Sequence, residues 1–186
     1  MRLFVAVVPP PGAVEDLDRF LEPRRDVAGP RWSDPARWHL TLAFIPSAPE
    51  RVLDGLGDRL QAVASGWSPT SLALAGGGCF PDVTRARVLW CGVRGGEALA
   101  PLARSVRSAA AVVGAAPDGG PFRPHLTLAR FARPVEGTRW VRLLDGYAGP
   151  GWVADEVVLV QSHLPRRRGH HPRHEVVGRF AVPPRH

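Results

Sequence analysis

The sequence predicts an α+β fold made of two lobes of similar construction. Apolar, strand-like segments alternate with amphipathic helical segments, and most connections between them are short. The strand pattern HLTLAF at 39–44 returns as HLTLARF at 125–131, and the two copies share five consecutive identical residues. A chain of 186 residues can hold one sizeable core, or two small lobes that share one. We therefore expect a single bilobal domain over residues 1–186, its lobes related by a pseudo-two-fold axis.

The first third of the chain has two strand patterns, each followed by a helix pattern. Residues 2–8 (RLFVAVV) predict a strand that three prolines end, and residues 11–21 then begin with proline and carry apolar residues at helical spacing. Residues 38–45 (WHLTLAFI) predict a second strand, and the apolar face of residues 50–64 predicts a second helix. Segment 22–37 is rich in Pro and Arg and is expected to be a surface loop.

The remainder of the chain continues this alternation. A glycine-rich turn at 76–78 and a loop through Phe80-Pro81 are expected to separate two strands. A second Pro/Arg-rich surface loop is expected at 165–173. The predicted strands are 71–75, 87–93, 124–131, 152–161 and 175–182, and the predicted helices are 97–113 and a shorter one at 139–144.

Composition places the chain among globular proteins, since 45% of its residues are hydrophobic. No apolar run approaches the roughly 20 residues of a membrane helix, and the apolar start is too short for a signal peptide. We therefore expect no membrane association and a cytoplasmic location. Cys79 and Cys91 are expected to be reduced packing residues, because no ligands for zinc flank them.

The net charge of +7 comes from arginine alone, because all 24 cationic residues are Arg. Codon usage in a GC-rich genome would account for this. A basic surface that attracts a polyanion would account for it equally, since guanidinium groups suit phosphate well. Charge therefore makes a nucleic-acid partner plausible without establishing one.

The repeated strand places a histidine and a threonine side by side. Successive side chains of a strand point to opposite faces, so His39 and Thr41 share one face and the leucines between and after them share the other. The same alternation applies to His125 and Thr127. A lone buried histidine is more often a satisfied core residue, but two such pairs on otherwise apolar strands need a reason to face the same way. Two lobes that face one another would bring both pairs into one cleft.

Two imidazoles and two hydroxyls in one cleft suit the hydrolysis of a phosphodiester. A neutral imidazole accepts a proton from attacking water, and a protonated one gives a proton to the departing oxygen. The threonine hydroxyls can donate to the non-bridging oxygens, and Arg130 can add a cation at the end of the same strand. This arrangement requires no metal or cofactor. The residues alone leave open which histidine is the acid and which is the base.

The sequence resembles the 2H phosphoesterase superfamily, and within it the bacterial and archaeal RNA 2′,3′-cyclic phosphodiesterases once called 2′-5′ RNA ligases. The two His-x-Thr motifs that name the superfamily correspond to HLTL at 39–42 and 125–128. The resemblance extends over nearly the whole chain, through RLFVAVVPP, GCFPDVTRARVLWCGV, PFRPHLTLAR and WVADEVVLVQSHL in that order. Two departures are Ile45-Pro46, where the family has Leu-Gly, and His174, where it commonly has Tyr.

The resemblance implies a bilobal fold of antiparallel sheet with outer helices and a central cleft. It implies hydrolysis of 2′,3′-cyclic phosphates to 2′-phosphomonoesters, with His39 as proton donor, His125 as proton acceptor, and Thr41 and Thr127 beside them. Some relatives also join RNA ends through a 2′-5′ linkage in vitro, which would be a secondary activity here. We expect Arg130, Arg123 and Phe80 to contact the substrate.

Several alternatives remain open from the sequence. The substrate can be an RNA end, a small cyclic nucleotide derivative or a 2′-5′ oligonucleotide, and a non-catalytic RNA-binding module is the first rival. A metal-dependent hydrolase built on the C-terminal histidines is the second rival, although no helical ligand spacing supports it. The arginines of the loop can follow an RNA backbone or be solvated. We expect a monomer. The histidines of the metal alternative are His163, His170, His171 and His174, and the arginines of the loop are Arg166, Arg167, Arg168 and Arg173.

Overall fold

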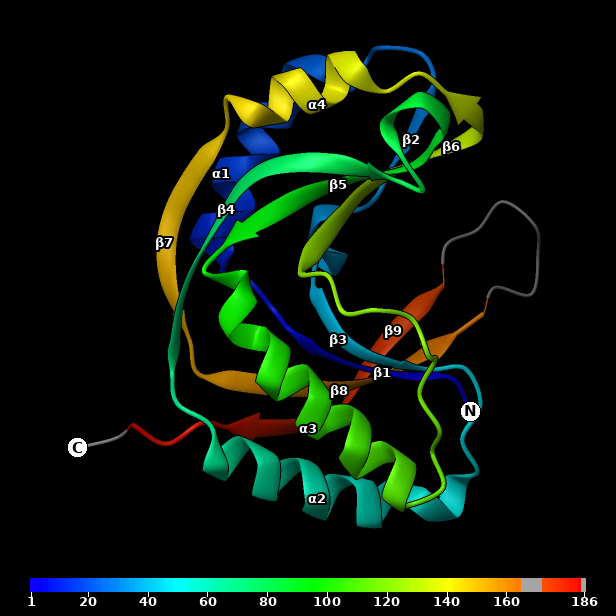
Figure 1. The fold of residues 1–186 in the computed structure, drawn as a ribbon, viewed down its shortest axis with the longest axis vertical. Helices are drawn as coiled ribbons and strands as arrows, with labels where there is room; N and C mark the ends of the chain where they lie inside the picture. Colours follow the sequence, from blue (N-terminus) through cyan, green and yellow to red (C-terminus); the bar gives the residue numbers. More distant parts are fainter. Residues whose placement is uncertain (165–171, 185–186) are drawn as a thin grey trace.

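The fold is α+β, as predicted. The computed structural model describes residues 1–164 and 172–184, which form one curved nine-stranded sheet with antiparallel pairings and four α-helices packed on it (Figure 1). The strands are β1 (Leu3–Val7), β2 (Pro30–Trp32), β3 (Leu40–Ile45), β4 (Thr70–Phe80), β5 (Ala86–Arg94), β6 (His125–Val135), β7 (Ala148–Ala154), β8 (Glu156–His163) and β9 (Arg173–Ala181). The helices are α1 (Pro11–Leu21), α2 (Leu53–Gly66), α3 (Leu99–Val112) and α4 (Thr138–Asp145).

The sheet divides into two halves of four main strands each. Its order is β7-β4-β5-β6-β3-β1-β8-β9, with β2 paired to β6. We call β7-β4-β5-β6 with β2 the β4 half, and β3-β1-β8-β9 the β1 half. Helices α1 and α4 pack on the β4 half, whereas α2 and α3 pack on each other and on the β1 half (Figure 1). Within the described residues, no helix is long and apolar enough to cross a membrane.

The two halves meet where the repeated motifs pair with each other. Strands β3 and β6 are antiparallel, and Leu40 lies opposite Leu126 in the register. These leucines hold the same position in the two copies of HLTL, so an antiparallel pairing at this point relates the copies by a local two-fold axis. The junction therefore has the symmetry that the sequence repeat suggested.

The alternation predicted for the motif strands is confirmed. The motif leucines at positions 40, 42, 126 and 128 are all buried in the main core beneath the helices. The opposite face of the β1 half carries a second apolar cluster of Phe4, Ala6, Val158 and Val160, against which Phe44 packs. One face of the sheet thus holds the core, and the other offers a partly apolar floor beside the histidines.

Helix α1 shows how local sequence sets the element boundaries. Pro11 stands at the first helical position, where its missing N–H is no loss. Ala13, Leu17 and Leu21 follow at intervals of four and are the buried residues of the helix. The predicted range of 11–21 is therefore the observed one.

Three segments differ from their predictions. The glycine-rich stretch 76–78 is not a turn, because β4 runs through it to Phe80 with an irregular register against β5. Gly76 has a φ of +64° at this irregularity, a conformation that favours glycine. The predicted strand 152–161 is split: β7 pairs with β4 and β8 pairs with β1. Segment 22–37, predicted as a loop, contributes β2 to the sheet.

Gly77 is required by close packing rather than by a turn. A Cβ at this position would lie 2.6 Å from the carbonyl oxygen of Trp90 and would also overlap the Leu144 side chain. We expect Gly77→Ala to lower the free energy of unfolding by about 1–3 kcal/mol, measured by urea denaturation. Gly57→Ala is the matched control, because Gly57 lies in α2 with nothing within 4 Å of such a Cβ. It should stabilise the protein by about 0.5–1 kcal/mol. Equal stability of Gly77→Ala and the wild type would contradict the packing argument.

Candidate active site

The predicted histidine–threonine pairs line one cavity at the junction of the two halves. His39 directly precedes β3 and His125 begins β6, so the β3–β6 pairing holds the two histidines close to each other. The cavity has a volume of about 490 Å³, and both histidines, Thr41 and Thr127 are in its wall. This size is in the usual range for a small-molecule or nucleotide site.

Each histidine is held by the same hydrogen bond. Nδ1 of His39 lies 2.7 Å from the carbonyl oxygen of Arg37, and Nδ1 of His125 lies 2.7 Å from that of Arg123. A carbonyl can only accept, so in both rings Nδ1 carries the hydrogen. Nε2 of each neutral ring then keeps its lone pair, and it becomes an N–H donor when the ring is protonated. Either imidazole is thereby prepared for acid or base chemistry through Nε2.

Aromatic side chains fix the plane of each imidazole. Phe4 stacks on His39, with ring centroids 4.4 Å apart and an interplanar angle of 17°. Phe80 meets His125 at 4.9 Å and 89°, and it also packs against Trp90. A stacked ring and a perpendicular ring both leave the imidazole little room to rotate. The two histidines thus have different aromatic neighbours although their hydrogen bonds are alike.

Burial keeps both histidines neutral in the free protein. The pKa of His39 is lowered from 6.5 to about 4: loss of hydration is the main cause, the bond to the Arg37 carbonyl opposes the shift, and the nearby His174 and His125 add to it. Burial also lowers the pKa of His125, and the cations Arg123 and Arg130 act in the same direction. Both imidazoles are therefore expected to be neutral near pH 7 before an anion binds.

Of the three residues expected to contact the substrate, one lines the cavity. Arg130 lies in its wall, whereas Arg123 and Phe80 are outside it. The backbone carbonyl of Arg123 accepts the hydrogen bond from His125, and the guanidinium of Arg123 lies 5.7 Å from the Phe80 ring centroid. Phe80 thus adjoins His125, and Arg123, which is exposed, adjoins Phe80; their contact with a substrate stays a prediction.

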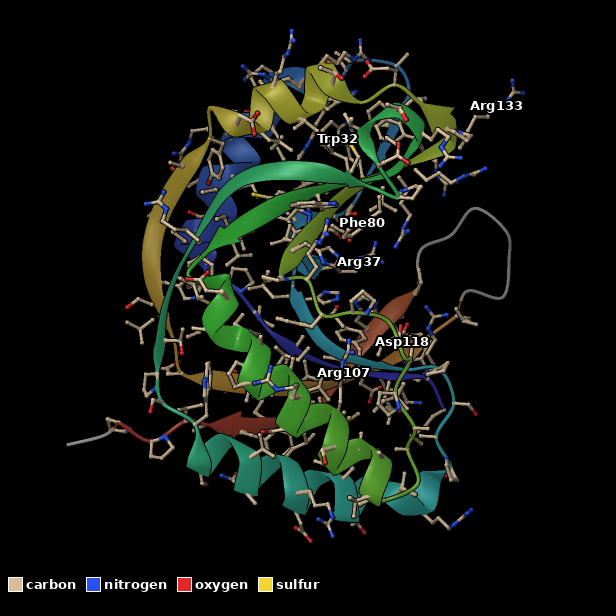
Figure 2. All side chains as sticks on the ribbon, viewed as in Figure 1. Trp32, Arg37, Phe80, Arg107, Asp118 and Arg133 are labelled. Carbon is tan, nitrogen blue, oxygen red and sulfur yellow. The ribbon has the colours of Figure 1, made fainter. Side chains whose placement is uncertain are left out.

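Arg2, Arg37, Asp118 and His174 line the cavity and were missed as site residues. Figure 2 labels Arg37 and Asp118, which come from the segments before β3 and before β6. The ring of His174 lies 5.7 Å from His39 and 5.0 Å from Phe4, edge-on to both. An arginine two residues before each motif histidine extends the repeat and could have directed attention to Arg37. His174 stands where the family commonly has Tyr, which is a signal of its own. Arg2 and Asp118 have no local signal, because strand register and loop packing bring them to the cavity.

The C-terminal histidines show no metal site in the described part of the chain. No group of three or more His, Cys, Asp or Glu residues is placed to hold a metal ion there. His163 instead lies 3.0 Å from a carboxylate oxygen of Glu175, which Arg173 also contacts at 3.3 Å. The remaining residues of that prediction and of the arginine run lie outside the described residues, namely Arg166, Arg167, Arg168, His170 and His171.

The fold and the site define an α+β protein with one antiparallel sheet and paired His-x-Thr strands that face a common cavity. A model of the 2′-5′ RNA ligase superfamily matches residues 9–166, and the chain belongs to this family. The resemblance to the 2H phosphoesterase superfamily is thereby confirmed.

Curated relatives from bacteria and archaea carry one name. An "RNA 2′,3′-cyclic phosphodiesterase" of Archaeoglobus fulgidus is 33% identical over 133 residues, which are 72% of this chain and 74% of that protein. A protein of the same name from Geobacillus stearothermophilus is 40% identical over 99 residues, which are 53% of this chain. The match spans only 32% of the Geobacillus protein.

Solved structures share the fold over the whole chain. The crystal structure of TT0787 of Thermus thermophilus has a TM-score of 0.81 and 27% identity, with all of both chains covered. The crystal structure of E. coli LigT complexed with 3′-AMP has a TM-score of 0.68 and 25% identity, with 97% of this chain and 96% of that chain covered.

The lowered pKa of His39 predicts how the free energy of unfolding depends on pH. In the unfolded chain this histidine takes up a proton as the pH falls through about 6.5, but in the folded protein it does so only near 4. The unfolded state therefore binds more protons between these values, and stability falls with the pH in this window. We expect the loss between pH 7 and 4.5 to be about 2 kcal/mol smaller in His39→Gln than in the wild type, by urea denaturation at each pH. The same loss in both proteins would show that His39 titrates normally.

Proposed function

We propose that this protein hydrolyses 2′,3′-cyclic phosphates at RNA ends to 2′-phosphomonoesters, with His39 and His125 as its acid and base. The observation that carries the proposal is the pair of His-x-Thr motifs in the wall of one cavity. The name shared by relatives of the family, RNA 2′,3′-cyclic phosphodiesterase, supports it. The complex of the similar E. coli LigT with 3′-AMP supports a nucleotide as ligand of this fold.

In the proposed step, His125 acts as the base and His39 as the acid. Nε2 of His125 accepts a proton from a water molecule, and the oxygen of that water forms a bond to phosphorus. The bond between phosphorus and O3′ breaks, and Nε2–H of His39 gives its proton to O3′. The product keeps the phosphate on O2′ and has a free 3′ hydroxyl. The step consumes one water, and the two histidines exchange protons with solvent to return to their starting states.

The substrate itself supplies the charge that the acid requires. His39 is neutral near pH 7 in the free protein, because burial holds its pKa at about 4. A phosphodiester anion in the cavity favours the protonated imidazole and raises this pKa. The hydroxyls of Thr41 and Thr127 and the cation of Arg130, all in the cavity wall, are available to the non-bridging oxygens. The bound anion thus favours the protonated form of His39, which is the form that acts as the acid.

The sequence alternatives differ from this proposal in what they hydrolyse or bind. A small cyclic nucleotide derivative or a 2′-5′ oligonucleotide would use the same two histidines. In 2′-5′ ligation the 5′ hydroxyl of a second RNA would attack the cyclic phosphate in place of water, with O3′ again as the leaving group. A binding module would hold RNA without turnover. A metal-dependent hydrolase would lose activity in chelator, whereas the proposed acid and base would not. Product analysis with and without chelator therefore separates these alternatives.

The central experiment uses a short RNA that ends in a 2′,3′-cyclic phosphate, incubated with the protein in EDTA. We expect a 2′-phosphate product, resolved from the 3′-phosphate by chromatography. His39→Ala and His125→Ala should each lower kcat by about 10²–10⁴-fold, since each removes a proton-transfer group.

His163→Ala is the control for the histidine variants. His163 is bonded to Glu175 and is outside the cavity wall, so its loss should leave turnover near the wild-type value. The proposal fails if the wild type turns over neither RNA ends nor nucleoside 2′,3′-cyclic phosphates.

A second prediction concerns the proton on His39. Uridine 2′-monophosphate, the product of a uridine cyclic phosphate, should raise the pKa of His39 by about one unit or more above its value near 4, because the phosphate is an opposite charge beside the ring. Uridine, which lacks the phosphate, is the control and should leave the pKa unchanged. NMR titration of the imidazole measures both. An unchanged pKa at saturating nucleotide would rule out His39 as a neighbour of the phosphate.

A further inference from the structure

A second cavity adjoins the first, and the proposed chemistry does not use it. Its volume is about 480 Å³, and it shares Phe4, His39 and His174 with the first cavity. Beyond these rings, much of its lining is apolar and consists of the side chains of Val8, Val158, Val160 and Val176. His39 and His174 therefore stand in a wall that is common to both cavities.

Strand β1 connects the two cavities along one face of the sheet. Alternate residues share a face, which in this strand and its flanks is that of Arg2, Phe4, Ala6 and Val8. Arg2 and Phe4 line the first cavity, Phe4 and Val8 line the second, and Ala6 belongs to the apolar cluster with Phe4. At about 3.3 Å per residue, this row is roughly 20 Å long. Together the two adjoining cavities have room for more than a mononucleotide.

The charges of the second cavity suit a polyanion. Arg37 lines both cavities, and Arg173 and Arg179 line the second. Arg37 lies 3.7 Å from Asp34 and donates to the Pro172 carbonyl. Arg173 and Arg179 are paired with Glu175 and Glu156, but their side chains stay 69% and 62% exposed, so they remain open to a further anion. No Asp or Glu is among the described residues that line this cavity. A cationic rim suits the phosphates of single-stranded nucleic acid, and the Phe4 ring with the apolar floor offers a surface on which a base can lie.

We infer that the second cavity binds the nucleotide that precedes the terminal one in a single-stranded RNA substrate. The base of this nucleotide lies on the valine floor, and the phosphate that links it to the terminal nucleotide lies near Arg37, at the boundary between the cavities. The inference rests on the proposed function, because it takes the cyclic phosphate to occupy the first cavity. It makes the protein selective for RNA strands over free cyclic nucleotides.

The test compares two substrates on the wild-type protein. One is uridine 2′,3′-cyclic phosphate, and the other is the dinucleotide UpU ending in a 2′,3′-cyclic phosphate. We expect kcat/KM to be about fivefold or more higher for the dinucleotide, since apolar contact of one base with such a floor contributes about 1 kcal/mol or more. Hydrolysis of both substrates with equal kcat/KM would overturn the inference and leave the proposed function intact. Turnover of neither would overturn the proposed function and, with it, the inference.

A matched pair of variants locates the selectivity. Val176 lines the second cavity and is 46% exposed, whereas the adjacent Val177 is 39% exposed and is outside the cavity wall. Val176→Asp should reduce the ratio of the two kcat/KM values toward one, mainly by raising KM for the dinucleotide. Val177→Asp introduces the same charge one residue away and should keep the wild-type ratio. Thermal unfolding of both variants checks that they fold, and Val176→Leu, which keeps the floor apolar, should keep the ratio. An unchanged ratio in folded Val176→Asp overturns the inference.

Discussion

The pairing of β3 with β6 is the constraint on which the site depends. Leu40 lies opposite Leu126, and the strict alternation of side chains along a strand then fixes what stands on each face. The leucines enter the core under the helices, and the histidines and threonines face the cavity. A slip of one residue in either strand would send its histidine and threonine into the core and its two motif leucines into the cavity. Burial of the motif leucines in the hydrophobic core therefore stabilises this register, and the register in turn fixes the positions of the site residues.

Much of this arrangement could be predicted because it rests on local patterns. The repeat and its alternation identified the motif side chains and the faces they occupy, and proline and helical spacing located α1. The failures came from interactions between distant segments. Gly77 resembles part of a turn in the sequence, yet it is a place where strand β4 passes close to Trp90 and Leu144. His174 reaches the cavity through the register of β9 on β8, where it lies opposite Ser162. No window of sequence contains that information.

The two histidines are alike in their bonds but unlike in their surroundings. Both use Nδ1 to hold a backbone carbonyl, so both present Nε2 for chemistry. His39 is stacked under Phe4 and has His174 beside it, whereas His125 has Phe80 at its edge and two arginines nearby. The pseudo-symmetry therefore does not extend to the side chains that surround the two histidines. This difference would help the acid and base of the proposed mechanism to hold different protonation states.

The order of the strands has a consequence for how the protein folds. The first strand, β1, lies in the β1 half; α1 and β2 then lie in the β4 half, and β3 and α2 lie in the β1 half again. It then builds β4 and β5 on one side, α3 on the other, and finally passes from β7 to β8 across the molecule. Neither half is a continuous piece of polypeptide. The lobes consequently cannot fold one after the other as they are synthesised, and β8 and β9, which complete the β1 half, come from the last part of the chain. The wall of the cavity accordingly combines residues from near both ends of the described chain, Arg2 and His174 among them, and is complete only when these segments have met.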